Sequence, residues 1–424
     1  MLMMTSDKRY SEAIVWIWLS GETAPIVSGK LEIEGDKILF NYGRSYLERI
    51  NDTKPAISIY RPELPLIAGQ LPLLNGLSMP GCIRDAAPDA WGRRVILNRL
   101  SGLKGTEIET ASLSELTYLL ESGSDRIGAL DFQLSPTEYV SRSSGNVTLE
   151  ELVDSAERVE KGIALSPDLD QALFHGSSIG GARPKALIED MGKKYIAKFS
   201  SSTDLYSVVK AEYIAMRIAK LAGLSVASVK MTKAANKDVL LIERFDRIPE
   251  SKGWSRKCMV SSLTLFGLDE MMARYASYEM FAEIIRHRFS NPKESLKELF
   301  SRLVFNILCG NTDDHARNHA AFWDGKMLSL TPAYDICPQG RTGNEASQGM
   351  LISSNNNLSQ LKTCMETAHH FLLSENAARK IFKKQKSVIE DNWESICDEV
   401  ELSEVDRMLL WKRQFLNPFS VQEN

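Results

Sequence analysis

The first sixty residues alternate short apolar runs with turn residues, a pattern that is typical of β-strands. One apolar run covers residues 13–19. Two more strands are predicted over residues 31–34 and 37–42, and the dipeptide Gly35-Asp36 between them favours a tight hairpin. The polar, aperiodic stretch 141–146 is predicted to be a linker. The amino-terminal part is therefore expected to be rich in β-structure and to become helical from about residue 80.

The middle and the end of the chain show a different pattern. Residues 194–199 and 239–245 are predicted to be strands, and residues 210–222 between them a helix that stops at Gly223. Beyond residue 255 the spacing is mostly helical. The clearest helix begins after Asn291-Pro292. Its apolar face is formed by Leu296, Leu299, Phe300, Leu303, Val304, Ile307 and Leu308.

The composition narrows the class of protein. With 424 residues, 43% of them hydrophobic and 25% charged, the chain is long enough for two or three globular domains. A net charge of −4 gives no overall attraction to nucleic acid. The six cysteines include no C-x-x-C pair, which argues against structural zinc and for a reduced protein. Residues 1–9 are too short and polar for a signal peptide, and no apolar run has membrane-spanning length, so we expect a cytoplasmic protein.

The candidate chemistry is concentrated late in the chain, in residues 310–318 with the sequence GNTDDHARN. Asp313 and Asn318 are five positions apart, which is the spacing of a phosphoryl-transfer catalytic loop. In such a loop the aspartate accepts the proton of the substrate hydroxyl and the asparagine holds a magnesium ion. A second metal-binding aspartate must follow, and Asp335 is placed for that role. The spacing therefore predicts a kinase.

A glycine- and serine-rich stretch at residues 175–185 is the candidate phosphate-binding loop, because small residues let backbone N–H groups approach phosphate oxygens. Gly176 and Gly181 have the spacing of a Walker A loop, but Ala182 stands where that motif needs lysine, so the P-loop NTPase interpretation fails. By itself the stretch is equally compatible with a turn between strands. The residues that follow it favour the kinase interpretation. A lysine on a predicted strand, a glutamate on the next helix and the charged end of a later strand come in the order of a kinase small lobe.

These motifs resemble the HipA family of bacterial serine/threonine kinases, the toxins of type II toxin–antitoxin modules. The resemblance implies an α+β, two-lobed, protein-kinase-like fold with an amino-terminal β-rich subdomain and a mostly helical C-terminal lobe. The expected domains are a β-rich part with added helices (1–143), a nucleotide-binding small lobe (144–250) and a helical lobe with the catalytic loop and metal site (251–424). The segments that carry the resemblance are 178–185, 242–247, 310–318 and 330–335, with weaker similarity at 88–92 and 119–129.

The resemblance also implies roles for individual residues. Asp313 would be the catalytic base, Asn318 and Asp335 would hold Mg²⁺, and Glu212 would orient Lys198. Ser178 falls where the family carries a self-phosphorylated serine, with Ser177 beside it as the alternative. The residues expected at the ATP site are Gly180, Gly181, Ala182, Arg183, Pro184, Lys185, Lys198, Glu243, Arg244, Phe245, His315, Arg317 and Tyr334.

The expected cofactors are ATP and Mg²⁺. The expected partners are a small helix-turn-helix antitoxin similar to HipB, DNA only indirectly through that antitoxin, and a protein substrate in translation such as an aminoacyl-tRNA synthetase; no membrane partner is expected. Two alternatives stay open on the residues alone. One is a kinase of the same fold that acts on a small molecule, and the other is a catalytically silent, ATP-binding co-repressor that acts with its antitoxin.

Overall fold

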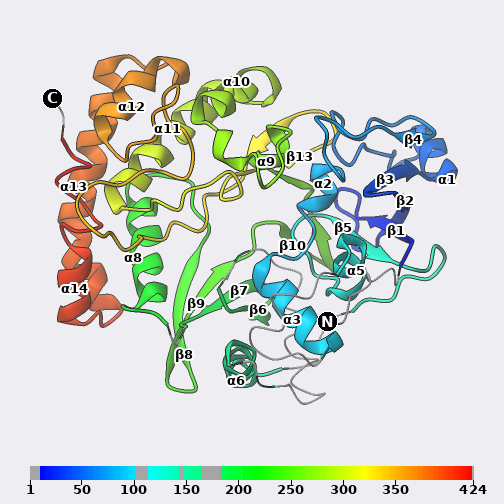
Figure 1. The fold of residues 1–424 in the computed structure, drawn as a ribbon, viewed down its shortest axis with the longest axis horizontal. Helices are drawn as coiled ribbons and strands as arrows, with labels where there is room; N and C mark the ends of the chain where they lie inside the picture. Colours follow the sequence, from blue (N-terminus) through cyan, green and yellow to red (C-terminus); the bar gives the residue numbers. More distant parts are fainter. Residues whose placement is uncertain are drawn as a thin grey trace, which may run out of the picture.

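The computed structural model describes residues 10–101, 113–142, 147–161, 163, 181, 183–201 and 203–422. Figure 1 shows the amino-terminal sheet on the right, a second sheet formed by β6–β9 at the lower centre, and the C-terminal helices on the left. Of the predicted linker 141–146, residues 143–146 lie outside the described residues. Among the described residues no helix is both long and apolar enough to cross a membrane.

The amino-terminal sheet is antiparallel, with the strand order β4-β3-β2-β1-β5. The predicted hairpin is confirmed: Glu34 pairs with Lys37, and Gly35 takes the positive φ of 64° that the turn requires. The strands are β1 (Glu12–Ile17), β2 (Ile26–Glu34), β3 (Lys37–Tyr42), β4 (Gln70–Leu71) and β5 (Leu130–Gln133). The helices are α1 (Arg44–Leu47), η1 (Glu48–Asn51), α2 (Gly81–Arg84), α3 (Ala90–Ser101) and α5 (Glu115–Glu121).

The second sheet has four antiparallel strands in the order β6-β7-β9-β8. Both predicted strands and the helix between them are present, each within a few residues of the expected bounds. The elements are α6 (Leu149–Glu160), β6 (Lys185–Asp190), β7 (Lys193–Phe199), α8 (Val208–Leu221), β8 (Val229–Ala234) and β9 (Lys237–Glu243).

This sheet is covered on both faces, which explains why β9 is a continuous apolar run. Val239 and Leu241 point to one face and pack with α3 and α6. Leu240 and Ile242 alternate to the other face, where they join the main core with α8. One helix of the amino-terminal part, α3, thus belongs to the hydrophobic core of the β6–β9 sheet, because its Trp91 is fully buried there.

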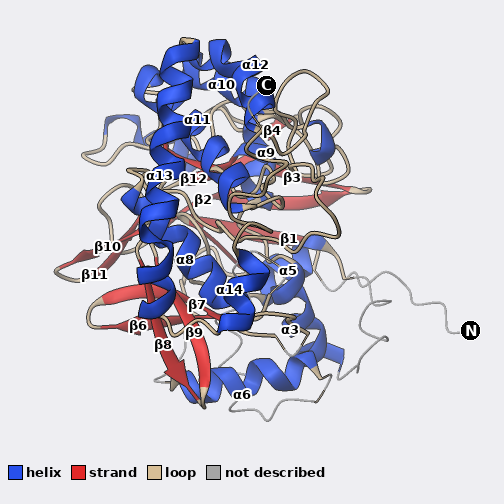
Figure 2. Ribbon diagram, turned by 90° about the vertical axis from the view of Figure 1, so that its left-hand side faces the viewer, coloured by secondary structure: helices blue, strands red, loops and turns tan. Residues whose placement is uncertain are grey.

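The rest of the chain is mostly helical, as predicted. In both views α8 lies against α13, so the small sheet is tied to the C-terminal helices (Figures 1 and 2). The elements after β9 are β10 (Arg247–Glu250), β11 (Gly253–Arg256), β12 (Met259–Ser261), α9 (Ser262–Leu265), η3 (Ala273–Tyr275), α10 (Tyr278–Arg288), α11 (Pro292–Cys309), β13 (Ala320–Trp323), β14 (Leu328–Leu330), α12 (Leu361–Thr367), η4 (Ala368–Phe371), α13 (Glu375–Glu399) and α14 (Glu404–Leu410).

Helix α11 delivers the chain into the candidate catalytic loop. It follows Asn291, has Pro292 in its first turn, and its predicted apolar face is buried. It ends at Gly310, whose φ of 75° is left-handed, and the N–H of Asn311 then donates to the carbonyl of Asn306 at 2.8 Å. A Cβ at Gly310 would lie 2.7 Å from the backbone oxygen of Gln414, so this helix end also needs the small size of glycine.

Candidate active site

Two lysines lie side by side at the centre of the candidate site. Lys185 on β6 and Lys198 on β7 are direct cross-strand partners, so both side chains point to the same face of the sheet. The Nζ of Lys198 donates to Glu212 Oε1 on α8 at 2.7 Å and to Asp335 Oδ1 at 2.5 Å. The predicted partnership of Lys198 and Glu212 is therefore present, and the sequence-distant Asp335 joins it.

The charges of this trio stabilise one another. Burial opposes the charge of Lys198, but the Asp335 and Glu212 carboxylates outweigh it and raise the pKa of the ammonium above its usual range. Partial burial disfavours the charged form of Asp335, yet Lys198 and Lys185 lower the pKa of this carboxyl to about 2. Glu212 is fully buried, and its desolvation raises its pKa despite Lys198. Lys198 is therefore protonated and Asp335 ionised, which places a cation and a carboxylate side by side.

Lys185 is the second cation of the site. Burial and the neighbouring charge of Lys198 lower its pKa to about 8. Its Nζ occupies the space where a Cβ of Gly181 would be, and Gly181 has a φ of 106° that favours glycine. The backbone conformation thus favours glycine at this position, and a larger residue would also displace the end of the lysine side chain.

The catalytic loop presents Asp313 at the surface of the site. Partial burial, together with the nearby carboxylates of Asp335 and Asp314, raises the pKa of Asp313, although His315 acts in the opposite direction. The side-chain amide of Asn318 donates to the backbone carbonyl of Asp313 at 3.2 Å. The two residues that the spacing paired are therefore in contact across the loop.

A buried polar cluster below the loop fixes its shape. The carboxylate of Asp314 is almost fully buried and accepts a hydrogen bond from the hydroxyl of Tyr278. His319 Nε2 lies 2.9 Å from its other oxygen. Burial would raise the pKa of Asp314, but His319 and Tyr278 lower it. The two adjacent aspartates thus have opposite surroundings, with Asp313 facing the site and Asp314 anchored in the core.

Aromatic rings lie beside the loop. The ring of Phe245 is 5.8 Å from that of Tyr334 and 5.9 Å from that of Phe322, measured between centroids. The hydroxyl of Tyr334 donates to the carbonyl of Arg317 at 2.8 Å, so this residue links the catalytic loop to Asp335. Phe245 and Tyr334, both expected at the ATP site, are thus neighbours, and their ring planes are tilted by 37° to each other.

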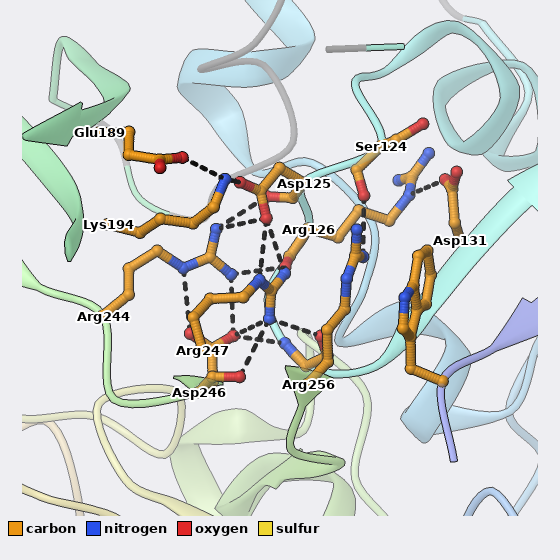
Figure 3. Close-up of polar contacts among 12 residues, drawn as sticks. Ser124, Asp125, Arg126, Asp131, Glu189, Lys194, Arg244, Asp246, Arg247 and Arg256 are labelled. Atoms are coloured by element: carbon orange, nitrogen blue, oxygen red, sulfur yellow. Dashed lines mark hydrogen bonds and ion pairs between the residues drawn. The ribbon is translucent and has the colours of Figure 1, made fainter. Parts of the chain in front are cut away.

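Arg244, also expected at the ATP site, has its guanidinium committed elsewhere. The side chain is buried and pairs with Asp246 at 2.8 Å and with Asp125 at 3.0 Å. Figure 3 shows Arg244 and Arg247 converging on these two carboxylates, with Arg256 next to them. Asp125 comes from the amino-terminal part, so the cluster joins that part to the end of β9. The sequence indicated a nucleotide contact for Arg244, whereas the structure gives its side chain this structural role.

Four of the remaining predicted residues have side chains with contacts of their own. Arg183 pairs with Asp204 at 2.8 Å. The carboxylate of Glu243 pairs with Lys193 at 2.8 Å, and its backbone N–H donates to the carbonyl of Ser228 at 2.8 Å. Arg317 is held by two carboxylates, described below. The ring of His315 accepts from the N–H of Arg317 at 3.3 Å. Ser177, Ser178, Gly180 and Ala182 lie outside the described residues.

Asn318 and Asp335 fit a magnesium ion in chemistry. Mg²⁺ prefers oxygen ligands and commonly takes one or two carboxylates together with substrate phosphates. Asp335 is ionised and half-exposed, with its side chain 41% accessible, and Asn318 has an amide oxygen to offer. Among the described residues no group of three or more histidine, cysteine, aspartate or glutamate side chains is arranged as a metal site. A Mg²⁺ ion held by one carboxylate and one amide would need further oxygen ligands, such as substrate phosphates.

Comparison with known sequences covers both parts of the chain. The family model described as the HipA-like C-terminal domain matches residues 177–393, about half of the chain, and the HipA N-terminal domain matches residues 17–133. A curated relative from Shewanella oneidensis, named "Serine/threonine-protein kinase toxin HipA", is 27% identical over 186 residues, which are 38% of this chain and 42% of that protein. The Sinorhizobium fredii protein Y4dM is 23% identical over 73% of this chain and 74% of its own length. The matched segment thus covers less than half of the Shewanella relative.

The fold has a solved counterpart. The Shewanella oneidensis MR-1 structure described as the toxin–antitoxin system HipA, HipB and its operator DNA complex aligns with a TM-score of 0.69. The alignment covers 95% of each chain at 18% sequence identity, so it supports the fold. The expected two-lobed, kinase-like α+β architecture is confirmed by this match. With both of its domains matched by family models, the chain belongs to the HipA family.

Proposed function

We propose that this chain is a Mg-ATP-dependent serine/threonine protein kinase and the toxin of a toxin–antitoxin pair. The observation that carries the proposal is the contact of Lys198 with both Glu212 and Asp335, which assembles a phosphate-binding cation and an ionised metal-binding carboxylate from distant segments. Phosphoryl transfer needs mostly positioning and charge stabilisation, and these residues supply both. The curated relative that is named a kinase toxin supports the same activity.

In the proposed reaction Lys198 and Lys185 neutralise the phosphates of ATP. A bound Mg²⁺ held by Asn318 and Asp335 would supply further charge neutralisation. Asp313 orients the serine hydroxyl and takes its proton as the oxygen attacks the γ-phosphorus, and ADP leaves. Its raised pKa suits this role, because a base works best when its pKa lies closer to the working pH.

The finer parts of the proposal concern substrates and partners. We propose that the chain phosphorylates a translation component, for example an aminoacyl-tRNA synthetase, and also itself at Ser178 or Ser177. A phosphoserine carries almost two negative charges, so next to the phosphates of ATP it would repel the nucleotide and limit activity. We also propose a small helix-turn-helix antitoxin as partner, since the structural counterpart was solved with HipB and operator DNA.

The test is intact-mass measurement and peptide mapping after incubation with Mg-ATP. The wild-type chain is expected to gain one phosphate, on Ser178 or Ser177. In Asp313→Asn the rate of this self-phosphorylation should fall by several orders of magnitude, while the circular dichroism spectrum stays that of the wild type. Asp154→Asn is the matched control, because Asp154 is an exposed carboxylate on α6 that pairs only with its helix neighbour Arg158 among the ion pairs described.

Three other results would contradict all or part of this proposal. ATP binding without any phosphate transfer to protein would favour a kinase for small molecules or a silent ATP-binding partner. Phosphorylation by Asp313→Asn at the wild-type rate would refute the role of that base. A wild-type chain that binds no ATP would contradict the proposal as a whole.

A further inference from the structure

The carboxylate of Asp89 has one partner shortly before strand β6 and another in the candidate catalytic loop. Its Oδ2 accepts a hydrogen bond from the N–H of Gly181 at 2.7 Å. Its Oδ1 accepts from Nη1 of Arg317 at 2.5 Å. These partners lie 92 and 228 residues away along the chain, and Asp89 itself comes from the amino-terminal part. One side chain therefore bridges three parts of the molecule.

Both partners stand next to groups with proposed roles in phosphoryl transfer. Gly181 lies shortly before Lys185 in the sequence, and its Cα is packed against the ammonium of that lysine. Arg317 directly precedes Asn318 in the catalytic loop. Its carbonyl accepts from Tyr334, which directly precedes Asp335. A shift of Asp89 would thus move the proposed phosphate-binding cations on one side and the proposed metal ligands on the other.

Asp89 is held firmly in place. Its carbonyl accepts from the N–H of Arg93 at 2.9 Å, which fixes it at the start of α3. Trp91, fully buried, donates its indole N–H to the carbonyl of Lys185 at 3.0 Å and its backbone N–H to that of Gly181 at 3.2 Å. Residues 89–91 therefore form hydrogen bonds with both Gly181 and Lys185. The carboxylate is 25% exposed, so water screens its interactions only in part.

We propose that Asp89 is a positioning residue for phosphoryl transfer, which holds Gly181, and with it Lys185, in register with the catalytic loop through Arg317. This role rests on the proposed kinase function. Asp89 touches no reacting atom, and it acts by keeping two loops from different lobes at a fixed separation. Displacing a reacting group by about 1 Å can cost about a hundredfold in rate. The amino-terminal part thereby completes the active site of the kinase lobes.

The charges around Arg317 determine how the variants should behave. Besides Asp89, its guanidinium contacts the carboxylate of Glu270. Burial opposes its charge, and Asp89 followed by Glu270 outweighs that effect and raises its pKa. Asp89→Asn keeps an oxygen that can accept from Gly181 but loses the ion pair with Arg317, whereas Asp89→Ala loses both contacts. The two variants should therefore form a graded series.

The experiment measures kcat and KM for ATP in the wild type, Asp89→Asn, Asp89→Ala, Arg317→Gln and the double variant Asp89→Asn/Arg317→Gln. We expect kcat/KM to fall about tenfold in Asp89→Asn and more in Asp89→Ala. Because the two residues act through one contact, the double variant should be no worse than the poorer single variant. Hydrogen exchange of the peptide covering residues 181–190 should rise in Asp89→Ala and stay at the wild-type level in the control Asp154→Asn.

Each outcome supports or overturns the role. An active wild type together with unchanged kcat/KM in Asp89→Asn would overturn the positioning role and leave the kinase function intact. Additive losses in the double variant would overturn the coupling to Arg317. A fall in activity that matches a loss of folded protein, seen as a lowered melting temperature in Asp89→Asn, would mean a merely structural residue. A wild type without phosphoryl transfer would overturn the proposed function and this role together.

Discussion

Replacing Asp125 with alanine is expected to cost about 3–5 kcal/mol of stability, as is usual when one partner of a buried ion pair is removed. The carboxylate accepts hydrogen bonds from Lys194 at 2.8 Å, Arg244 at 3.0 Å and Arg247 at 2.9 Å. The side chains of both arginines are at most 1% exposed, so water cannot replace the lost partner. Three charged hydrogen bonds at the lower value of about 1.5 kcal/mol each give a loss of similar size.

The loss is large because the remaining charges are unbalanced. Without Asp125, Asp246 is the main carboxylate left for Arg244, Arg247 and the nearby Arg256, which stacks on Trp18 at 3.4 Å. Asp125→Asn should cost less than Asp125→Ala, since an amide oxygen can still accept one or two of the hydrogen bonds. The cluster joins the amino-terminal part to β7 and β10. In Asp125→Ala we therefore expect these parts to separate first on unfolding.

Guanidinium denaturation followed by tryptophan fluorescence and by circular dichroism measures this effect. Two probes are needed, because a chain of this length need not unfold in a single step. The exposed ion pair of Asp154 and Arg158 supplies the control, and Asp154→Ala should change the free energy of unfolding by less than about 0.5 kcal/mol. If Asp125→Ala is no more destabilising than this control, the argument that the buried cluster holds the two parts together is wrong.

Three further predictions concern pH, the lysine partner and the end of α11. The pKa of Asp125 lies well below its usual value, because the cations around it outweigh its burial. The stabilisation that its charge provides is therefore complete above about pH 4 and is lost as the pH falls further. In acid titrations the difference in stability between the wild type and Asp125→Asn should shrink as the pH falls from about 5 to 2. Glu212→Gln should lower kcat/KM about ten- to a hundredfold, since a charged hydrogen bond to Lys198 is weakened, and an unchanged value would contradict this role. Gly310→Ala should cost at least about 1–2 kcal/mol in thermal unfolding, because of its left-handed φ and the backbone against it, while Gly340→Ala, with open space around it, should be close to neutral.

Local pattern was sufficient for much of the fold and for selecting residues 310–318 as the candidate catalytic loop. The β2–β3 hairpin, the strands around Lys198 and the helix α11 follow from apolar spacing and from turn and cap residues, which act within a few positions of each other. The spacing of Asp313 and Asn318 is local too, and the contact between them is present in the structure. The pairing of Lys198 with Glu212 followed from the order of motifs along the chain.

The surroundings of individual charges were decided only by the tertiary structure. Asp313 and Asp314 are identical and adjacent in sequence, yet one faces the site and the other is buried against Tyr278. Nothing in the residues near Arg244 indicates that its guanidinium binds Asp125, or near Asp89 that its carboxylate binds segments 92 and 228 residues away. The energy of a charge depends on its burial and on its partners, and for these residues both come from distant parts of the chain that meet only after folding.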